Sequence, residues 1–180
     1  MKGILSDNAR RSLTAALLVL VVDQVSKAWL LAFPSAEGQA QTFSFFGNSL
    51  SVVAMENLTF VFGLLADWPR SAQTGFLFFS ALLFFAVALV FFRSLGPGES
   101  ANAVALGLLM GGCVGNLADW GIRGAFIEIA HFRGFHASAS WNFNVADACI
   151  GAGIALLLVE LLVVEGASRA GGYPFTGTDG

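Results

Sequence analysis

The sequence is poor in charge. Only 12% of its 180 residues are Asp, Glu, Lys or Arg, whereas about 25% is usual for soluble globular domains. Hydrophobic residues make up 56%. These proportions exclude an ordinary soluble domain and indicate a membrane protein. The net charge of -3 also argues against nucleic-acid binding, because proteins that bind nucleic acids usually present a basic surface.

Cysteine and histidine are scarce as well. Cys113 and Cys149 both lie in apolar runs, which argues against a disulfide framework and favours small buried side chains. The spacing of His131 and His136 matches no strong metal site, and we interpret both as solvated loop residues. We therefore expect no metal ion and no cofactor.

Four apolar runs have the length of membrane spans. At a rise of 1.5 Å per residue, about 20 residues cross a hydrocarbon core of about 30 Å. The first run is too long for the apolar core of a signal peptide, and no small-residue cleavage site follows it. We predict an all-α membrane protein with four transmembrane helices at about residues 13–33, 72–92, 102–118 and 145–164.

Two longer segments are predicted to lie outside the membrane, at residues 34–71 and 119–143. The first contains rough alternation at 42–45 and a β-prone run at 50–53. These features indicate a small external β region, followed by an interfacial segment with Trp68 near the headgroups. We interpret the second segment as a loop. Residues 1–165 would form one membrane domain, and the Gly- and Thr-rich tail 166–180 is predicted to be disordered.

Lys and Arg residues predict the orientation, because cytoplasmic loops carry an excess of them. The excess lies on the side of the two termini, so we expect both termini in the cytoplasm and the two long segments outside. The residues compared are Lys2, Arg10, Arg11, Arg93 and Arg169 on the cytoplasmic side, and Arg70, Arg123 and Arg133 on the outer side.

Asp23 and Lys27 are four residues apart inside the first predicted helix. This spacing places them on one helix face, where they can form an ion pair. A pair costs far less in lipid than two separate charges. One interpretation is a neutral pair that holds helices together. The other is that this face lines a polar functional site.

Asp147 lies at the start of the fourth predicted helix, shortly after Asn144. One interpretation is helix capping, with Asn144 as the N-cap and Asp147 as the third helical residue. The other is a catalytic carboxylate held at the membrane surface. Asn116 and Asp119 lie at the end of the third helix that is predicted to face the same side.

Several polar residues thus gather on one side of the predicted bundle. Carboxylates that gather without a cysteine or a histidine pair indicate paired-carboxylate chemistry. In such a pair one group keeps a proton and the other acts as a base toward water, as in aspartic proteases. The residues are Asn57, Asn116, Asp119, Glu128, Asn144 and Asp147, with Asp23 and Lys27 deeper.

Three motifs in this set resemble those of the lipoprotein signal peptidases (signal peptidase II). They are DQVSK at 23–27, GGCVGNLAD at 111–119 and FNVAD at 143–147. In the second motif, Gly111 and Gly115 have the small-xxx-small spacing that permits close helix contact. The order, the spacing and the four-span layout agree with the family over roughly residues 10–165.

The resemblance implies an enzyme that removes signal peptides from bacterial prolipoproteins, just before a cysteine that carries diacylglycerol. It implies two catalytic aspartates and no metal, at the outer face of the inner membrane. Asp147 matches one of these aspartates, and Glu128 stands in the place of the other. The expected partners are diacylglyceryl-modified signal peptides and phospholipid. Residues expected to orient the substrate or support the site are Asp23, Lys27, Asn57, Asn116, Asp119, Arg123 and Asn144.

Three positions depart from the family pattern. Glu128 is one methylene longer than aspartate, which displaces its oxygens unless the surrounding loop adjusts. Trp120 replaces an arginine, for which Arg123 is a candidate substitute. Thr59 replaces a glycine in the external β region.

These departures keep two alternative functions open. The first is a catalytically silent or detuned relative that binds lipidated precursors or an inhibitor without cleaving them. The second is a small transport or channel subunit that uses the face of Asp23 and Lys27 as a polar path. Binding of a lipidated peptide would separate the two.

Overall fold

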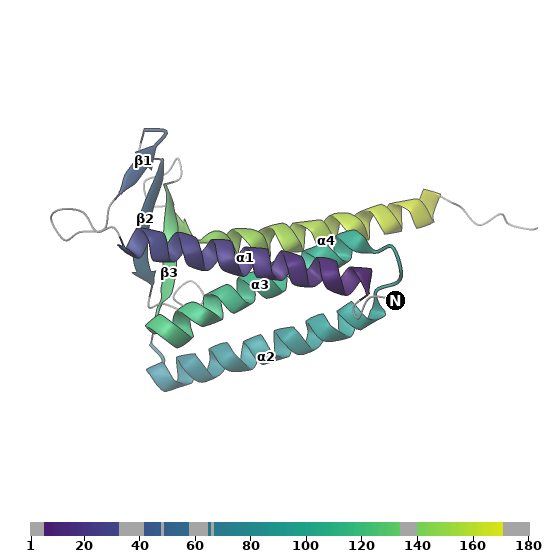
Figure 1. Ribbon diagram of the computed structural model, residues 1–180, viewed down its shortest axis with the longest axis horizontal. Helices are drawn as coiled ribbons and strands as arrows, with labels where there is room; N and C mark the ends of the chain where they lie inside the picture. Colours follow the sequence, from purple (N-terminus) through teal and green to yellow (C-terminus); the bar gives the residue numbers. More distant parts are fainter. Residues whose placement is uncertain are drawn as a thin grey trace, which may run out of the picture.

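The computed structural model describes residues 6–32, 42–47, 49–57, 65, 67–133 and 140–170. Four helices run side by side, and a small sheet lies across one end of them (Figure 1). The helices are α1 (Asp7–Ala32), α2 (Arg70–Ser94), α3 (Ser100–Arg123) and α4 (Val145–Ala170). All four are long and apolar enough to cross a membrane. The predicted fold class, four transmembrane helices with a small β region, is confirmed.

The helices extend beyond several predicted bounds. The predicted end of the third helix at residue 118 is wrong, because α3 continues to Arg123 and ends where Gly124 adopts a left-handed φ of 71°. The Gly124 N–H closes the last turn on the carbonyl oxygen of Trp120. Residues 166–170, predicted as the start of a disordered tail, are helical in α4. The rest of that tail lies outside the described residues.

Helix α3 packs closely against both α1 and α4, because glycines allow their backbones to approach. A Cβ atom added to Gly111 would lie 2.6 Å from the carbonyl oxygen of Ala16 on α1. One added to Gly112 would lie 2.6 Å from the carbonyl oxygen of Ala146 on α4. Only glycine fits at such distances, so the Gly-rich sequence of α3 fixes its place between the two helices.

Helix α2 is mostly exposed, as expected for a helix that faces lipid. Several of its contacts with α3 are apolar: Leu77 packs near Trp120, and Ala88 packs against Leu106 and Leu109. Trp68, which precedes α2, is half exposed, and its ring lies 6.2 Å from that of Phe76. Most of the interfacial segment predicted before Trp68 lies outside the described residues.

The sheet is antiparallel and has the strand order β1-β2-β3-β4. Its first two strands lie in the segment that was predicted to contain β structure. The other two lie in 119–143, so the prediction of a simple loop there is wrong. Polar residues on both faces of β3 hide the alternation that would predict a strand from the sequence. The strand is stabilised by its pairing with β2 and β4. The strands are β1 (Phe43–Phe45), β2 (Leu50–Asn57), β3 (Phe126–Arg133) and β4 (Ser140–Phe143).

Candidate active site

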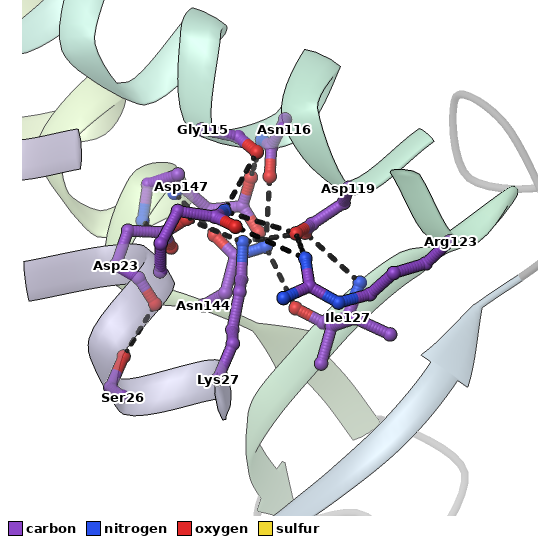
Figure 2. A network of polar contacts seen from close by, with 12 residues as sticks. Asp23, Ser26, Lys27, Gly115, Asn116, Asp119, Arg123, Ile127, Asn144 and Asp147 are labelled. Carbon is purple, nitrogen blue, oxygen red and sulfur yellow. Dashed lines mark hydrogen bonds and ion pairs between the residues drawn. The ribbon is translucent and has the colours of Figure 1, made fainter. Parts of the chain in front are cut away.

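The polar residues of the three sequence motifs meet where α1, α3 and α4 approach the sheet (Figure 2). Asp23, Lys27 and Asp119 have no exposed side-chain surface. The Nζ atom of Lys27 lies 2.7 Å from Oδ2 of Asp23 and 2.6 Å from Oδ2 of Asp119. The predicted pair of Asp23 and Lys27 is therefore present, and the same ammonium group also ties α1 to α3.

Arg123 supplies the second positive charge of this network. Its Nη1 atom lies 2.7 Å from Oδ1 of Asp119 and donates to Oε1 of Gln24 at 3.1 Å. Two carboxylates are thus matched by one ammonium and one guanidinium group. Because an uncompensated buried charge is costly, this neutral arrangement makes the buried network tenable in a membrane protein.

Gln24 is a member of the network that the sequence reasoning did not select. Its Nε2 atom donates to Oδ2 of Asp23 at 3.0 Å, to Oδ1 of Asp119 at 3.1 Å and to the carbonyl oxygen of Gly115 at 3.1 Å. Gln24 lies next to Asp23 in the DQVSK motif, and that adjacency was the only signal in the sequence.

Asp23 also holds the start of α4. Its Oδ1 atom accepts a hydrogen bond of 2.9 Å from the backbone N–H of Ala146. This N–H belongs to the first turn of α4, where unpaired donors and the helix dipole favour a negative charge. A Cβ atom added to Gly115 would lie 2.7 Å from Oδ2 of Asp23. Because Gly115 has no side chain, the carboxylate of Asp23 fits against the backbone of α3.

Asn144 and Asp147 form a reciprocal cap at the start of α4. The N–H of Asp147 donates to Oδ1 of Asn144 at 2.8 Å, and the N–H of Asn144 donates to Oδ2 of Asp147 at 3.2 Å. This pattern is a capping box, so the capping predicted for these two residues is present. Asn116 joins them by donating to Oδ1 of Asp147 at 2.8 Å and accepting from Asn144 at 2.9 Å.

The backbone of Ile127 connects this cap to β3. Strand β4 ends at Phe143, which pairs with Ala130. Before Ala130, the edge of β3 that faces away from β2 contacts helix residues instead of a strand. The N–H of Ile127 donates to Oδ2 of Asp119 at 3.2 Å, and its carbonyl oxygen accepts from Nδ2 of Asn144 at 3.2 Å (Figure 2). Both polar groups of one peptide residue are thus fixed by α3 and by the residue that precedes α4.

Glu128 follows Ile127 and lies on a strand, not on the predicted loop. It is 8% exposed, and its Oε1 atom accepts a hydrogen bond of 2.5 Å from Nδ2 of Asn57 on β2. The structure thus brings all the predicted site residues to this end of the bundle. Glu128 and Asn57 form one pair there, and the backbone of Ile127 links it to the network that contains Asp147.

Trp120 and Arg123 account for one departure from the family pattern. Trp120 donates from Nε1 to Oγ1 of Thr74 at 3.2 Å, and the guanidinium carbon of Arg70 lies 4.3 Å from the centre of its ring. These contacts fasten α3 to the start of α2. Arg123, one turn after Asp119, bonds to that carboxylate instead. Thr59, the third departure, lies outside the described residues.

His131 lies on β3, not on a loop, and its Nδ1 atom is 2.5 Å from Oδ1 of Asn142 on β4. His136 lies outside the described residues. In the part of the chain that the structure describes, no group of three or more His, Cys, Asp or Glu side chains is placed to hold a metal ion.

The sequence matches the family model of signal peptidase (SPase) II over residues 15–163. The chain belongs to the signal peptidase II family. It is 34% identical over 158 residues to a lipoprotein signal peptidase of Symbiobacterium thermophilum, covering 86% of this chain and 95% of the relative. It is 38% identical over 162 residues to one of Methylocella silvestris, covering 87% and 88%.

The fold of this chain also occurs in solved structures. A bacterial membrane enzyme superposes with a TM-score of 0.69 over 84% of this chain and 92% of the other, at 22% identity. The family predicted from the three motifs is confirmed, and with it an aspartic-type peptidase in a bacterial membrane. The transport or channel subunit is not favoured.

Proposed function

We propose that the chain removes signal peptides from diacylglyceryl-modified prolipoproteins, and that Asp147 and Glu128 activate the attacking water. The observation that carries this assignment is the distribution of positive charge. Lys27 and Arg123 neutralise Asp23 and Asp119. Within the described residues neither Asp147 nor Glu128 is paired with Lys or Arg, and neutral asparagines hold both.

This difference separates structural carboxylates from reactive ones. A carboxylate locked in a buried ion pair has its lone pairs occupied and its charge stabilised, so it is a poor base. A carboxylate held by neutral amides keeps its position and its capacity to exchange a proton. Asp147 is partly exposed, unlike Asp23 and Asp119. A substrate can therefore reach it.

In the proposed reaction one of the two carboxyl groups is protonated and the other is ionised. The ionised group takes a proton from water as the water oxygen bonds to the scissile carbonyl carbon. The protonated group donates its proton to the carbonyl oxygen, which gives a tetrahedral intermediate with two hydroxyl groups. When the carbon–nitrogen bond breaks, the proton taken from water passes to the leaving amine, and the other carboxylate regains a proton from one of these hydroxyl groups.

The remaining polar residues position these two groups. Asn116 and Asn144 hold Asp147, and Asn57 holds Glu128. The network of Asp23, Lys27, Asp119 and Arg123 joins α1, α3 and α4 to the strand that carries Glu128. Because displacements near 1 Å can lower rates about a hundredfold, such bracing is part of the activity.

We place the site at the outer face of the bacterial inner membrane, with both termini in the cytoplasm. The start of α1, the connection between α2 and α3, and the end of α4 lie together at the end opposite the sheet (Figure 1). This end carries Arg10, Arg11 and Arg93, as the positive-inside rule requires of a cytoplasmic side. The partners would be the lipid-modified signal peptide and the surrounding phospholipid.

The proposal is tested with purified protein in detergent and one prolipoprotein, prepared with and without the diacylglyceryl group. Mass spectrometry should detect cleavage just before the lipidated cysteine, and only in the modified precursor. Asp147→Asn, which is nearly isosteric, should abolish cleavage. Glu56→Gln, which changes an exposed carboxylate on β2 at the same end of the molecule, should leave the rate unchanged.

Two results would contradict parts of this proposal. Undiminished cleavage by Asp147→Asn would remove Asp147 from the mechanism. Binding of the modified precursor by the parent protein without any cleavage would instead identify a catalytically silent relative.

A further inference from the structure

We propose that Arg70 is a positioning residue for Glu128, because it holds the short turn that leads from α3 into β3. This inference rests on the proposed function, in which Glu128 acts on the substrate. Arg70 is the first residue of α2. It acts on Glu128 through the backbone of Gly124 and the ring of Trp120, which both lie at the end of α3.

The guanidinium group of Arg70 contacts the end of α3 in two ways. Its Nη2 atom donates a hydrogen bond to the carbonyl oxygen of Gly124, and its carbon atom lies 4.3 Å from the centre of the Trp120 ring. Carbonyl groups at the end of a helix lack partners within the helix, and the negative end of the helix dipole attracts a cation. The face of an indole ring also attracts a cation. An uncharged side chain at position 70 would lose both interactions.

Trp120 carries the contact with α2 onward to the sheet. Its Nε1 atom donates to Oγ1 of Thr74, near the start of α2, at 3.2 Å. Its ring lies 5.2 Å from the ring of Phe126, the first residue of β3. Phe126 pairs with Asn57 on β2, and Asn57 is the residue that donates to Glu128. The end of α3 therefore helps to place both the carboxylate and its hydrogen-bond donor.

The turn between α3 and β3 is short, so a shift at its start reaches Glu128. Gly124 and Ala125 alone separate the two elements. Gly124 has a φ of 71°, a conformation that glycine adopts easily and most other residues do not. Ala125 is 2% exposed and Ile127 is fully buried. Because this backbone is packed on both sides of Phe126, a displacement of the turn passes along the strand.

The backbone before Glu128 is thus fixed at two points. The carboxylate of Asp119 accepts a hydrogen bond from the N–H of Ile127 at 3.2 Å, and Arg70 donates to the carbonyl oxygen of Gly124. Loss of Arg70 frees the second point, and displacements near 1 Å lower rates about a hundredfold. Arg70 is exposed, so its contacts add little to the stability of the fold. Its loss should therefore change the rate more than the stability.

Cleavage kinetics of three variants test this role. The quantities measured are kcat and KM for the diacylglyceryl-modified prolipoprotein in detergent, together with Tm. Arg70→Met should lower kcat about tenfold or more, with smaller changes in KM and Tm. Arg70→Lys should retain more of the rate, because an ammonium group can still donate to the carbonyl oxygen. Arg133→Met removes an exposed arginine at the other end of β3 and, as the matched control, should leave kcat unchanged.

Amide hydrogen exchange tests the contact without any need for cleavage. Mass spectrometry of the peptide that contains residues 124–128 should show faster exchange in Arg70→Met than in the parent protein. Arg133→Met should leave the exchange of this peptide unchanged. Unchanged exchange in Arg70→Met would overturn the proposal, because the turn would then be held without Arg70.

Other outcomes separate a failure of this proposal from a failure of the proposed function. If Glu128→Gln leaves cleavage unchanged, the role of Glu128 fails and its positioning with it, while exchange still shows whether Arg70 holds the turn. If Glu128→Gln loses cleavage but Arg70→Met keeps the kcat of the parent, Arg70 does not position Glu128. A raised KM with an unchanged kcat in Arg70→Met would also overturn the proposal, because Arg70 would then bind the substrate.

Discussion

Replacing Lys27 by methionine should destabilise the protein strongly. The side chain of Lys27 is fully buried, and its ammonium group lies within 2.7 Å of two carboxylates that are themselves fully buried. Methionine fills a similar volume but removes the charge. Among the described residues, Asp23 then keeps only neutral donors, and Asp119 keeps Arg123 as its one cation.

The size of the effect follows from the cost of leaving a buried ion without its partner, which is about 3–5 kcal/mol. In a domain of 150–250 residues each kcal/mol shifts Tm by 2–4 °C, so Tm should fall by about 6–20 °C. Thermal unfolding of the purified protein in detergent measures this shift. Arg93→Met, which removes an exposed charge at the other end of the bundle, is the control and should change Tm by less than about 2 °C.

A second substitution shows whether the loss is electrostatic. Lys27→Met combined with Asp23→Asn removes the unpaired carboxylate and should recover several degrees of the lost Tm. If Lys27→Met alone leaves Tm unchanged, the buried ion network does not hold the helices together. If the Tm losses of Lys27→Met alone and Asp23→Asn alone simply add in the double variant, charge compensation is not the reason for the loss.

Three further substitutions, one of them with a matched control, examine other parts of the site. Gly115→Ala should lower Tm because its methyl group would lie 2.7 Å from Oδ2 of Asp23, whereas Gly121→Ala, which meets open space on the same helix, should raise stability by about 0.5–1 kcal/mol. Arg123→Met should lower Tm less than Lys27→Met, because Lys27 still neutralises Asp119 and the arginine side chain is partly exposed. Asn57→Leu removes the donor to Glu128 and should lower kcat more than it changes KM in the prolipoprotein cleavage assay; an unchanged kcat would show that Asn57 does not position the carboxylate.

Much of the helical framework could be predicted from the sequence, because transmembrane spans follow from length and hydropathy. The spacing of Asp23 and Lys27 predicts their ion pair for a similar reason, since both lie on one regular helix. The cap formed by Asn144 and Asp147 is equally local. The ion pair and the cap each depend on residues within one helical turn of each other.

Features that depend on distant residues could not be predicted in the same way. Strand β3 exists because β2 and β4 pair with it, and the sequence alone indicated a loop. Gln24 joins α1 to α3 through residues more than ninety positions away. The row of apolar residues that runs across the sheet through Phe45, Phe132 and Trp141 appears only once the register of the four strands is known, because each strand contributes only part of it.

The last turns of α3 show how tertiary contacts override a local boundary. The sequence becomes polar at Asn116 and Asp119, which suggested that the membrane span and the helix end together. The helix continues because those side chains bond to α1, α4 and β3 instead of to water. The polar residues thus lie within the protein at the end of the bundle.

The central claim is that Glu128 and Asp147 act together on the substrate. The most direct measurement is kcat for cleavage of a diacylglyceryl-modified prolipoprotein by the parent, Glu128→Gln and Glu128→Asp, with precursor binding measured in parallel. The account predicts that Glu128→Gln binds the precursor but loses cleavage by a factor of about a hundred or more, and that Glu128→Asp retains cleavage. Unchanged cleavage by Glu128→Gln would contradict the claim, because a carboxamide cannot exchange the proton that the mechanism requires.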